Sequence, residues 1–367
     1  MIKLDGNYGE GGGQIVRTAL AFSTITQIPF EITGIRSGRD KPGLKAQHLN
    51  CIKSLEKLCD AKSEGAELGS SFLKYWPGKI KGKTINIDIG TAGSITLLLQ
   101  SLLIPCFFAD KTVRLHLKGG TNVAWSMPIE YFEQVFVPHI AKYCEKIKVR
   151  LNKRGYYPAG NGEVDITIHP KFKLADYPDF NSFYKELHKQ NRGINSTEQH
   201  YLMQIKGVSH ASKDLEKADV AERQAKAARQ MLAKYNVPIS ISTEYSNTIS
   251  TGSGITLWAI FSKAKDDIDI INPIRLGADA LGERGKSSEE VGQEAAKGLI
   301  SQVDSKSPID KHLADNLIPF MALFCPSKIK ASELTNHTLT NIYIVEQFLG
   351  KVFEVNKEEK IISSRCI

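Results

Sequence analysis

The residues best suited to chemistry stand near the start of the chain, where glycines surround a single carboxylate. Residues 9–13 read Gly-Glu-Gly-Gly-Gly, and an amphipathic segment that carries Arg17 follows them. Glycines let backbone N–H groups approach a ligand closely, and a helix start adds partial positive charge. Glu10 is therefore suited to hold a divalent cation, and Arg17 is suited to bind a phosphate. A tight strand-to-helix turn without any ligand explains the same residues.

Neither of two familiar phosphate-binding motifs fits the chain well. The dinucleotide pattern G-x-G-x-x-G fails because Gln14 stands where the third glycine belongs. The segment 280–287 comes closer to a P-loop, but its first glycine is replaced and Glu283 would face the phosphates. A turn followed by a helix with a capping box of Ser287 and Glu290 explains this segment equally well.

Among the nine histidines, His337 has the setting most suited to nucleophilic catalysis. It lies within Thr-Asn-His-Thr, residues 335–338, and we expect it immediately before a helix that begins at about residue 340. A neutral imidazole can attack with one ring nitrogen while the other donates a proton to an orienting group. A histidine that only caps the helix is the alternative.

A second candidate site follows from the segment 310–324, which predicts a helix with two distinct faces. Its apolar stripe consists of Leu313, Leu317, Phe320 and Phe324. Its polar stripe, with the spacing i, i+3, i+4 and i+7, consists of His312, Asp315, Asn316 and Pro319. Polar groups in this register can read a nucleotide or bind a metal, and an ordinary exposed surface is the alternative.

Length and composition indicate a soluble globular protein of two domains. The 367 residues exceed a typical single domain, while 41% hydrophobic and 24% charged residues are ordinary values. No apolar run approaches the roughly 18 residues of a membrane span, and the first residues do not resemble a signal peptide. We therefore expect a cytoplasmic protein without a membrane partner.

The six cysteines are scattered without a C-x-x-C pair. The sequence therefore predicts small buried residues rather than a zinc site or a disulfide framework.

The net charge of +8 suggests an anionic partner. Its densest part is the segment 142–154, which holds six lysines and arginines and leads into Tyr156 and Tyr157. Basic residues beside aromatic rings suit single-stranded RNA, whose bases stack and whose phosphates need neutralising. A solvated surface of a helix and a strand is the alternative.

Predicted helices and strands alternate, which indicates an α/β or α+β fold. Residues 44–59 predict a helix, and the alternating residues 85–89 predict a strand. A glycine-containing turn at 90–94 and an apolar helix follow this strand, as at the N-terminus. A third copy of this arrangement is suggested at 334–349, so we expect an internal repeat.

A polar stretch between about residues 171 and 199 separates a further group of elements. Strands at 201–208, 239–244, 255–261 and 274–281, and a helix at 288–303, are expected there. The order fits a small α/β domain, residues 176–304, inserted into a large domain of residues 1–175 plus 305–367.

Several segments together resemble one family, the RNA 3′-terminal phosphate cyclases. They occur in order from end to end and comprise residues 5–21, 35–48, 64–70, 90–100, 119–122, 155–160 and 312–315, and His337. The glycine-rich head combined with the block 35–48 is the most specific part. The resemblance implies a large domain of three similar α/β units, each with a sheet and two helices, and a smaller inserted α/β domain.

The resemblance also implies a reaction. The histidine attacks the α-phosphate of ATP and becomes covalently linked to AMP, with release of pyrophosphate. AMP then passes to the 3′-phosphate of an RNA end, and attack by the 2′-hydroxyl leaves a 2′,3′-cyclic phosphate.

By this resemblance each candidate residue has a role. His337 matches the nucleophile, and Glu10 matches the acidic residue near the metal, Mg²⁺ or Mn²⁺, and the ATP phosphates. The nucleotide pocket would be lined by Gln100, His312, Asp315 and Asn316. The RNA terminal phosphate would be held by Arg17, Arg36, Arg39 and Gln47.

Some positions depart from the family pattern. Many members carry Tyr and Gln where this chain has His312 and Asn316, and the segment 123–128 also differs. The nucleotide preference, the RNA substrate and the oligomeric state are therefore left open.

Two other functions use related folds. A non-catalytic cyclase-like RNA-processing factor lacks the nucleophilic histidine, so His337 argues against it. An enolpyruvyl transferase has two lobes of repeated units and uses no adenylate, and the single expected insertion does not suit that plan.

Overall fold

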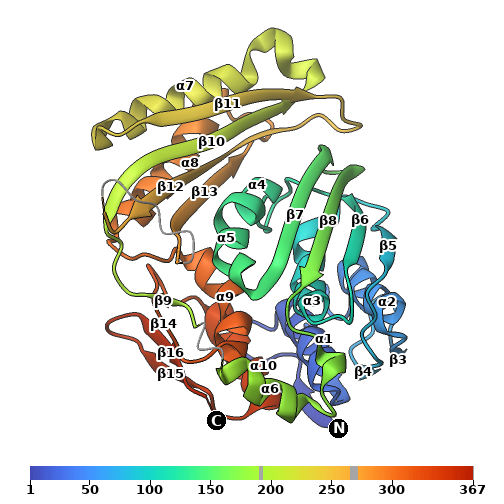
Figure 1. Ribbon diagram of the computed structural model, residues 1–367. Helices are drawn as coiled ribbons and strands as arrows, with labels where there is room; N and C mark the ends of the chain where they lie inside the picture. Colours follow the sequence, from blue (N-terminus) through green and yellow to red (C-terminus); the bar gives the residue numbers. More distant parts are fainter. Residues whose placement is uncertain (190–192, 265–271, 367) are drawn as a thin grey trace.

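The computed structural model of the chain describes residues 1–189, 193–264 and 272–366 (Figure 1). These residues form four four-stranded sheets with helices packed against them, which confirms the expected α/β class. Within this part of the chain, every helix is too short or too polar to cross a lipid bilayer.

Three of the sheets share one order of elements, β-α-β-α-β-β. In each, the first two strands pair in parallel and the remaining pairs are antiparallel. The first unit consists of β1 (Ile2–Asp5), α1 (Gln14–Thr26), β2 (Phe30–Thr33), α2 (Ala46–Cys59), β3 (Lys62–Glu64) and β4 (Leu73–Trp76). This topology confirms the expected fold of repeated units.

The second unit places an irregular helix at the second helical position. Its regular elements are β5 (Thr84–Asp88), α3 (Ile95–Phe107), β6 (Val113–Gly119), β7 (Cys144–Lys153) and β8 (Gly162–Pro170). The irregular helix comprises α4 (Ile129–Tyr131), a π-helical turn η1 (Phe132–Phe136), α5 (Val137–Ile140) and a 3₁₀ turn η2 (Ala141–Tyr143).

The third unit is interrupted after its first strand. It consists of β9 (Asn195–Ser196), α9 (Lys311–Leu323), β14 (Ser327–Lys330), α10 (Asn336–Leu349), β15 (Phe353–Asn356) and β16 (Ile361–Ser364). Before β9 the chain forms η3 (Leu174–Asp176) and α6 (Phe180–Lys189). The expected third copy of the turn-plus-helix arrangement, at 334–349, falls on α10. That expectation is wrong, because α10 is the second helix of its unit, whereas α1 and α3 are first helices.

The fourth sheet, with strand order β11-β10-β12-β13, lies between β9 and α9 in the chain and at the top of Figure 1. Its elements are β10 (Tyr201–Ser212), η4 (Lys213–Ala218), α7 (Val220–Leu232), η5 (Ala233–Tyr235), β11 (Ile239–Ser246), β12 (Ser253–Ser262), β13 (Ile274–Leu281) and α8 (Ser288–Asp304). The sheet and its two helices bury a hydrophobic cluster of their own. The domain boundaries 1–175 plus 305–367 and 176–304 stay a prediction.

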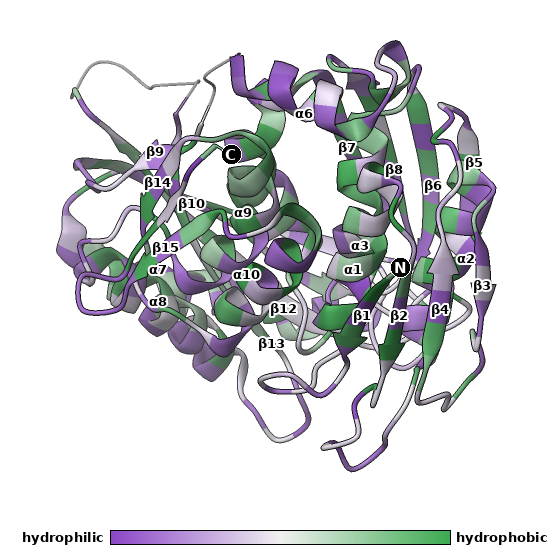
Figure 2. Cartoon of the chain, turned by 90° about the horizontal axis from the view of Figure 1, so that it is seen from below, coloured by the Kyte–Doolittle hydropathy of each residue, from purple (hydrophilic) through white to green (hydrophobic). Residues whose placement is uncertain are grey.

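Helices α1, α3, α9 and α10 pack together between the sheets of the three repeated units (Figure 2). Every residue of α1 is buried, and α3 is apolar almost throughout. Helices that are apolar all round are stable only in such an interior position. Polar side chains that α1 nevertheless carries, such as Arg17, therefore need partners from the neighbouring helices.

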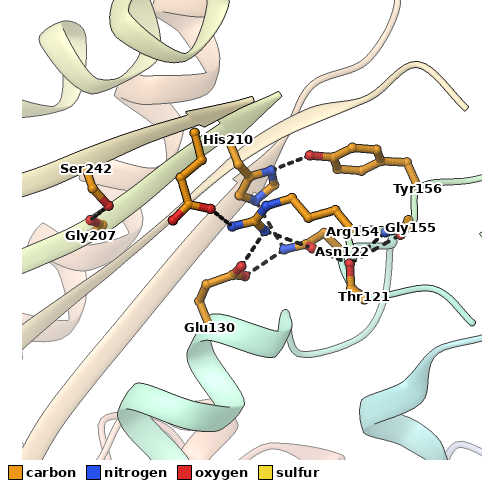
Figure 3. A network of polar contacts seen from close by, with 10 residues as sticks. Thr121, Asn122, Glu130, Arg154, Gly155, Tyr156, Gly207, His210 and Ser242 are labelled. Atoms are coloured by element: carbon orange, nitrogen blue, oxygen red, sulfur yellow. Dashed lines mark hydrogen bonds and ion pairs between the residues drawn. The ribbon is translucent and has the colours of Figure 1, made fainter. Parts of the chain in front are cut away.

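A buried polar network joins the second unit to the fourth sheet (Figure 3). Arg154 forms an ion pair with Glu130 of α4 and donates to Glu244 of β11 at 2.7 Å. Asn122 donates to Glu130 at 2.7 Å and contacts His210 of β10 at 3.1 Å. Because a buried charge is costly unless it is paired, this network holds the fourth sheet in one position against α4.

The expectation of no disulfide is wrong, because Cys325 and Cys366 are bonded to each other. Strands β14 and β16 are antiparallel with Ser327 opposite Ser364, so residues 325 and 366 lie opposite each other two residues beyond. The remaining cysteines, Cys51, Cys59, Cys106 and Cys144, are buried and free as expected. Residue spacing carried no sign of the bond, since only strand pairing brings the two cysteines together.

The disulfide gives a prediction about stability. Closing a loop over a separation of 41 residues restricts the unfolded chain, so Cys366→Ser should lower the free energy of unfolding by up to about 4 kcal/mol. Chemical denaturation without reductant measures the difference, with Cys144→Ser, which removes a free thiol, as the control. Equal stabilities of the wild type and Cys366→Ser would contradict the bond.

Candidate active site

The glycine-rich turn before α1 forms the floor of the candidate site. Gly9 and Gly11 have φ values of +60° and +56°, which L side chains rarely adopt. A Cβ atom on Gly13 would lie 2.0 Å from Nε2 of His48, so only glycine fits there. A Cβ atom on Gly12 would lie about 4 Å from both His337 Cε1 and Arg39 Nη2. The turn therefore passes directly between these two side chains.

His337 lies in the first turn of α10, not before the helix as the sequence suggested. The helix begins at Asn336, and the side chain of Thr335 caps it by accepting from the backbone N–H of Thr338. The expected start near residue 340 is wrong because the cap allows the polar residues 336–339 to form the first turn. His337 is thereby presented toward the N-terminus of α1.

Two hydrogen bonds between Gln14 and His337 fix the state of the imidazole. The amide nitrogen of Gln14 donates to the backbone carbonyl of His337 at 2.9 Å. The amide oxygen of Gln14 is therefore left to accept from Nδ1–H of the ring, with which it is in contact. In the neutral ring the proton is then on Nδ1, and Nε2 keeps its lone pair.

Glu10 is the carboxylate that faces Nε2 of His337. Its Oε2 lies 3.7 Å from that nitrogen and 3.4 Å from Nη2 of Arg39, and Asn336 donates to its Oε1 at 3.3 Å. In the described part of the chain, the one cluster of three or more potential metal ligands is His188 with Cys325 and Cys366, whose sulfurs are bonded to each other, and it does not include Glu10. A cation at Glu10 would therefore take its other ligands from a substrate phosphate and water, as Mg²⁺ commonly does.

The predicted phosphate-binding arginines lie around the first turn of α1. Arg17 is only 8% exposed and donates from Nε to Oε1 of Gln100 at 2.8 Å. Burial, with a smaller contribution from Arg36, lowers the pKa of Arg17 to about 10. Burial and the charge of Arg39 also lower the pKa of Arg36. Nε of Arg36 is buried and has no hydrogen-bond partner within the described ranges, so this donor suits an anionic ligand.

His48 and Gln47 complete this cluster from α2. Burial and the charges of Arg17, Arg36 and Lys45 lower the pKa of His48 to about 3. Its Nδ1 accepts from the backbone N–H of Lys45 at 2.9 Å, so the ring is neutral. Gln47 donates to the carbonyl of Ser94, which caps α3, at 3.0 Å.

A small cavity of about 30 Å³ lies beside the arginines, between α1, α3, α9 and α10. This volume is about that of one water molecule, so a larger ligand would need the surrounding side chains to move. Gln100 donates to Asn316 at 2.9 Å inside it and so connects Arg17 to α9. Its lining includes Thr18, Gln100, Asp315, Asn316, Asn341 and the apolar side chains of Phe22, Leu103, Met127, Phe136 and Phe320.

Asp315 is buried in the wall of this cavity. It accepts from the hydroxyls of Thr335, at 2.6 Å, and Thr338. Burial raises the pKa of Asp315, and these two hydrogen bonds oppose the shift. His312 is exposed one turn earlier and does not line the cavity. The structure thus gathers every predicted site residue except His312, which lies at the periphery.

Sequence reasoning missed the residues that orient the others. Gln14 was considered only as the residue that breaks a glycine motif, and Asn341 was not considered at all. Both lie four residues from another site residue on their own helix, Asn341 from His337 and Gln14 from Thr18. That i, i+4 spacing is the signal that could have found them.

Comparisons with known proteins show to which family the chain belongs. A family model described as RNA 3′-terminal phosphate cyclase matches residues 8–355. A relative from Pyrococcus furiosus with the name RNA 3′-terminal phosphate cyclase is 45% identical, over 97% of this chain and 95% of its own. Relatives of the same name from Pyrococcus abyssi and Methanosarcina acetivorans are 42% and 41% identical, each over 98% of this chain and over 96% and 98% of their own. The chain therefore belongs to the RNA 3′-terminal phosphate cyclase family.

The contact between Gln14 and His337 predicts a particular tautomer. In Gln14→Leu the acceptor for Nδ1–H is lost, so the ratio of the Nδ1–H to the Nε2–H form should fall about fivefold, equivalent to about 1 kcal/mol. Nitrogen-15 NMR of labelled imidazole measures this ratio. Thr18→Val, which removes the neighbouring bond between α1 and α10, serves as the control and should leave it unchanged.

The neutral His48 predicts a dependence of stability on pH. Between about pH 6.5, its ordinary pKa, and pH 3, the unfolded chain takes up a proton that the folded chain does not. The free energy of unfolding should therefore fall as pH falls through this range, with a contribution from His48 of up to about 1.4 kcal/mol per pH unit. His48→Asn keeps an acceptor for Lys45, so denaturation between pH 6.5 and 4 should show a smaller slope. Parallel slopes would contradict the prediction.

Proposed function

We propose that this protein converts the 3′-terminal phosphate of an RNA into a 2′,3′-cyclic phosphate and uses ATP as the energy source. The names of its relatives describe this activity for those proteins. The observation that carries the proposal is the pair formed by Gln14 and His337, which leaves the Nε2 lone pair free beside Glu10. A nucleophile needs such an oriented and unprotonated nitrogen.

In the first step Nε2 of His337 would attack the α-phosphorus of ATP. A phosphorus–nitrogen bond forms, the bond to the bridging oxygen breaks, and pyrophosphate leaves, so that AMP is attached to the histidine. The proton on Nδ1 stays in place, and Gln14 accepts from it while the ring gains positive charge. Gln100, Asp315 and Asn316, which line the small cavity, would contact the nucleotide once the cavity widens, with His312 at its periphery.

In the second step an oxygen of the RNA 3′-phosphate would attack the same phosphorus, and His337 would leave. The 2′-hydroxyl then attacks the 3′-phosphorus, AMP departs, and the cyclic phosphate remains. Arg17, Arg36, Arg39 and Gln47 would hold the terminal phosphate. The role of the three arginines is supported by the planar guanidinium group. It binds phosphate oxygens with paired donors and stabilises the charge that builds up during transfer.

Glu10 fits a role as protein ligand to a divalent cation, Mg²⁺ or Mn²⁺. It is partly exposed and its carboxylate oxygens are hard ligands of the kind that these ions prefer. The ion would supply charge neutralisation of the triphosphate as pyrophosphate departs.

Labelling with α-³²P-ATP tests the proposal before any RNA is added. Wild type with a divalent cation should form a labelled adduct that survives denaturation and is released by acid. His337→Ala should form less than about a thousandth of it, because removing a nucleophile abolishes the step. His116→Ala, which changes an exposed histidine of β6, should label like the wild type.

Addition of 3′-phosphorylated RNA should then discharge the adduct and yield the cyclic phosphate. A folded wild-type protein that forms no adduct with either cation would contradict the proposal. That result would favour a non-catalytic RNA-processing role instead.

A further inference from the structure

The loop between β6 and α4 exposes an aromatic side chain that the reaction leaves unexplained. Trp125 is 98% exposed, the largest exposure among the large hydrophobic side chains of the described residues. Its φ value is +58°, in the left-handed region that a bulky residue seldom occupies. A fully hydrated indole held in a strained backbone points to a binding role rather than to packing.

The loop that carries Trp125 is held firmly on both sides. The hydroxyl of Ser126 donates to the carbonyl of Val123 at 3.0 Å, and Thr96 donates to the carbonyl of Met127 at 2.6 Å. The backbone N–H of Ile129 donates to the carbonyl of Thr121 at 3.0 Å. The backbone that carries the indole is therefore fixed, which reduces the entropy that the loop loses when a ligand stacks on the ring. We call the loop of residues 121–129 the platform.

This platform lies beside the candidate active site. The backbone of Gly120, at the base of the loop, donates to Gly93 at 2.8 Å in the turn before α3. Gln47 of the arginine cluster donates to Ser94 in that same turn. On its other side the loop supplies Met127 to the lining of the cavity. A chain that leaves the arginine cluster across this turn therefore meets the loop of Trp125.

A second exposed ring lies in a neighbouring loop that contacts the same turn. Tyr157 is 76% exposed in the loop between β7 and β8. A Cβ atom on Gly160 of that loop would lie 2.6 Å from the carbonyl of Thr91 and 2.7 Å from Cα of Ala92, so the loop rests on the turn. Lys146, Lys148 and Arg150 are exposed along β7, which leads into this loop. An aromatic ring at the end of a strand that carries exposed cations suits a single-stranded nucleic acid, because the ring can stack on a base and the cations can neutralise phosphates.

We propose that Trp125, together with Tyr157 of the neighbouring loop, forms a stacking subsite for the bases of single-stranded RNA that precede the 3′-terminal nucleotide. The subsite deepens the proposed function, because it assumes that an RNA end enters at the arginine cluster. Every base has a π-face, so stacking adds affinity without choosing a sequence. The subsite therefore makes binding depend on the length of the strand, and it favours single strands over duplex ends, whose bases are already stacked.

Equilibrium binding without ATP tests the subsite independently of catalysis. The probes are 3′-phosphorylated oligoribonucleotides of one and four nucleotides, titrated into the wild type and Trp125→Ala. The variant should bind the tetranucleotide about tenfold more weakly and the mononucleotide unchanged, since one stacked base is lost. Trp125→Phe should restore most of the affinity. Tyr201→Ala, which removes a half-exposed ring at the start of β10, is the matched control and should have no effect.

An abasic tetranucleotide sharpens the test. Removing the base next to the terminal nucleotide should weaken binding to the wild type about tenfold and leave Trp125→Ala unchanged, because both changes delete the same contact. Equal affinities of the wild type and Trp125→Ala for the intact tetranucleotide would overturn the subsite, and so would an equal loss with the mononucleotide.

Adduct formation with ATP distinguishes this proposal from the proposed function. Trp125→Ala should label His337 at the wild-type rate. A weaker affinity for ATP with unchanged binding of RNA would place the nucleotide on Trp125 and overturn the subsite. A wild type that forms no adduct but shows the length dependence would reject the cyclase reaction and keep the RNA subsite.

Discussion

The arrangement of the site depends on two hydrogen-bonded contacts between α1 and α10, helices that are 323 residues apart in the chain. Gln14 pairs with His337, and one turn further along both helices Thr18 pairs with Asn341 at 2.7 Å. Because both pairs follow the i, i+4 spacing in the same direction, the two helices run parallel with their N-termini side by side. The glycine turn of the first unit and the histidine of the third can meet only in this register.

The contacts extend from this pair of helices to α9 and α3. Asn341 donates to the backbone carbonyl of Asp315 at 2.7 Å, and the carboxylate of Asp315 accepts from the two threonines at the start of α10. Gln100 joins α3 to both α1 and α9. Burial strengthens each of these hydrogen bonds and makes an unpaired group costly, so the four helices have one favourable arrangement. If any one of these helices shifted relative to the others, a buried polar group would lose its hydrogen-bond partner.

The inserted sheet is tied to the same helices. Asp310 caps α9 through the N–H groups of His312 and Leu313 and also accepts from Tyr131 at 2.6 Å and from Gly277 of β13 at 2.9 Å. The carboxylate that begins α9 thus holds the fourth sheet as well. An insertion between β9 and α9 is compatible with the repeat because it lengthens one connection and leaves all three sheet orders unchanged.

Much of the fold could be predicted from local patterns, since amphipathic periodicity and capping act over a few residues. The helix at 44–59, the strand at 85–89 and the capping box at Ser287 are present in the structure as α2, β5 and the start of α8. The assignment of 334–349 to the wrong helical position shows the limit of this reasoning, because strand pairing defines the repeat. The bond between Cys325 and Cys366 was missed for the same reason. The resemblance named the candidate site residues. The contacts of Gln14 could not be predicted, because they depend on which amide atom faces which partner, and three-dimensional packing decides that.

The distribution of charge explains why a phosphate suits this site. Arg17 and Arg36 are cations whose pKa values are lowered by burial, so desolvation makes their charged forms less favourable. The hydrogen-bond partner of Arg17 is the neutral amide of Gln100. His48, which is close to both arginines, is uncharged. An anion that entered this cluster could therefore form ion pairs with Arg17 and Arg36, neither of which forms an ion pair with a carboxylate of the described residues. Glu10 lies instead beside His337, and the same carboxylate oxygen also faces Nη2 of Arg39 at 3.4 Å. A phosphate would consequently be drawn toward the buried arginines, while a cation would be held at Glu10, whose Oε2 lies 3.7 Å from Nε2 of His337.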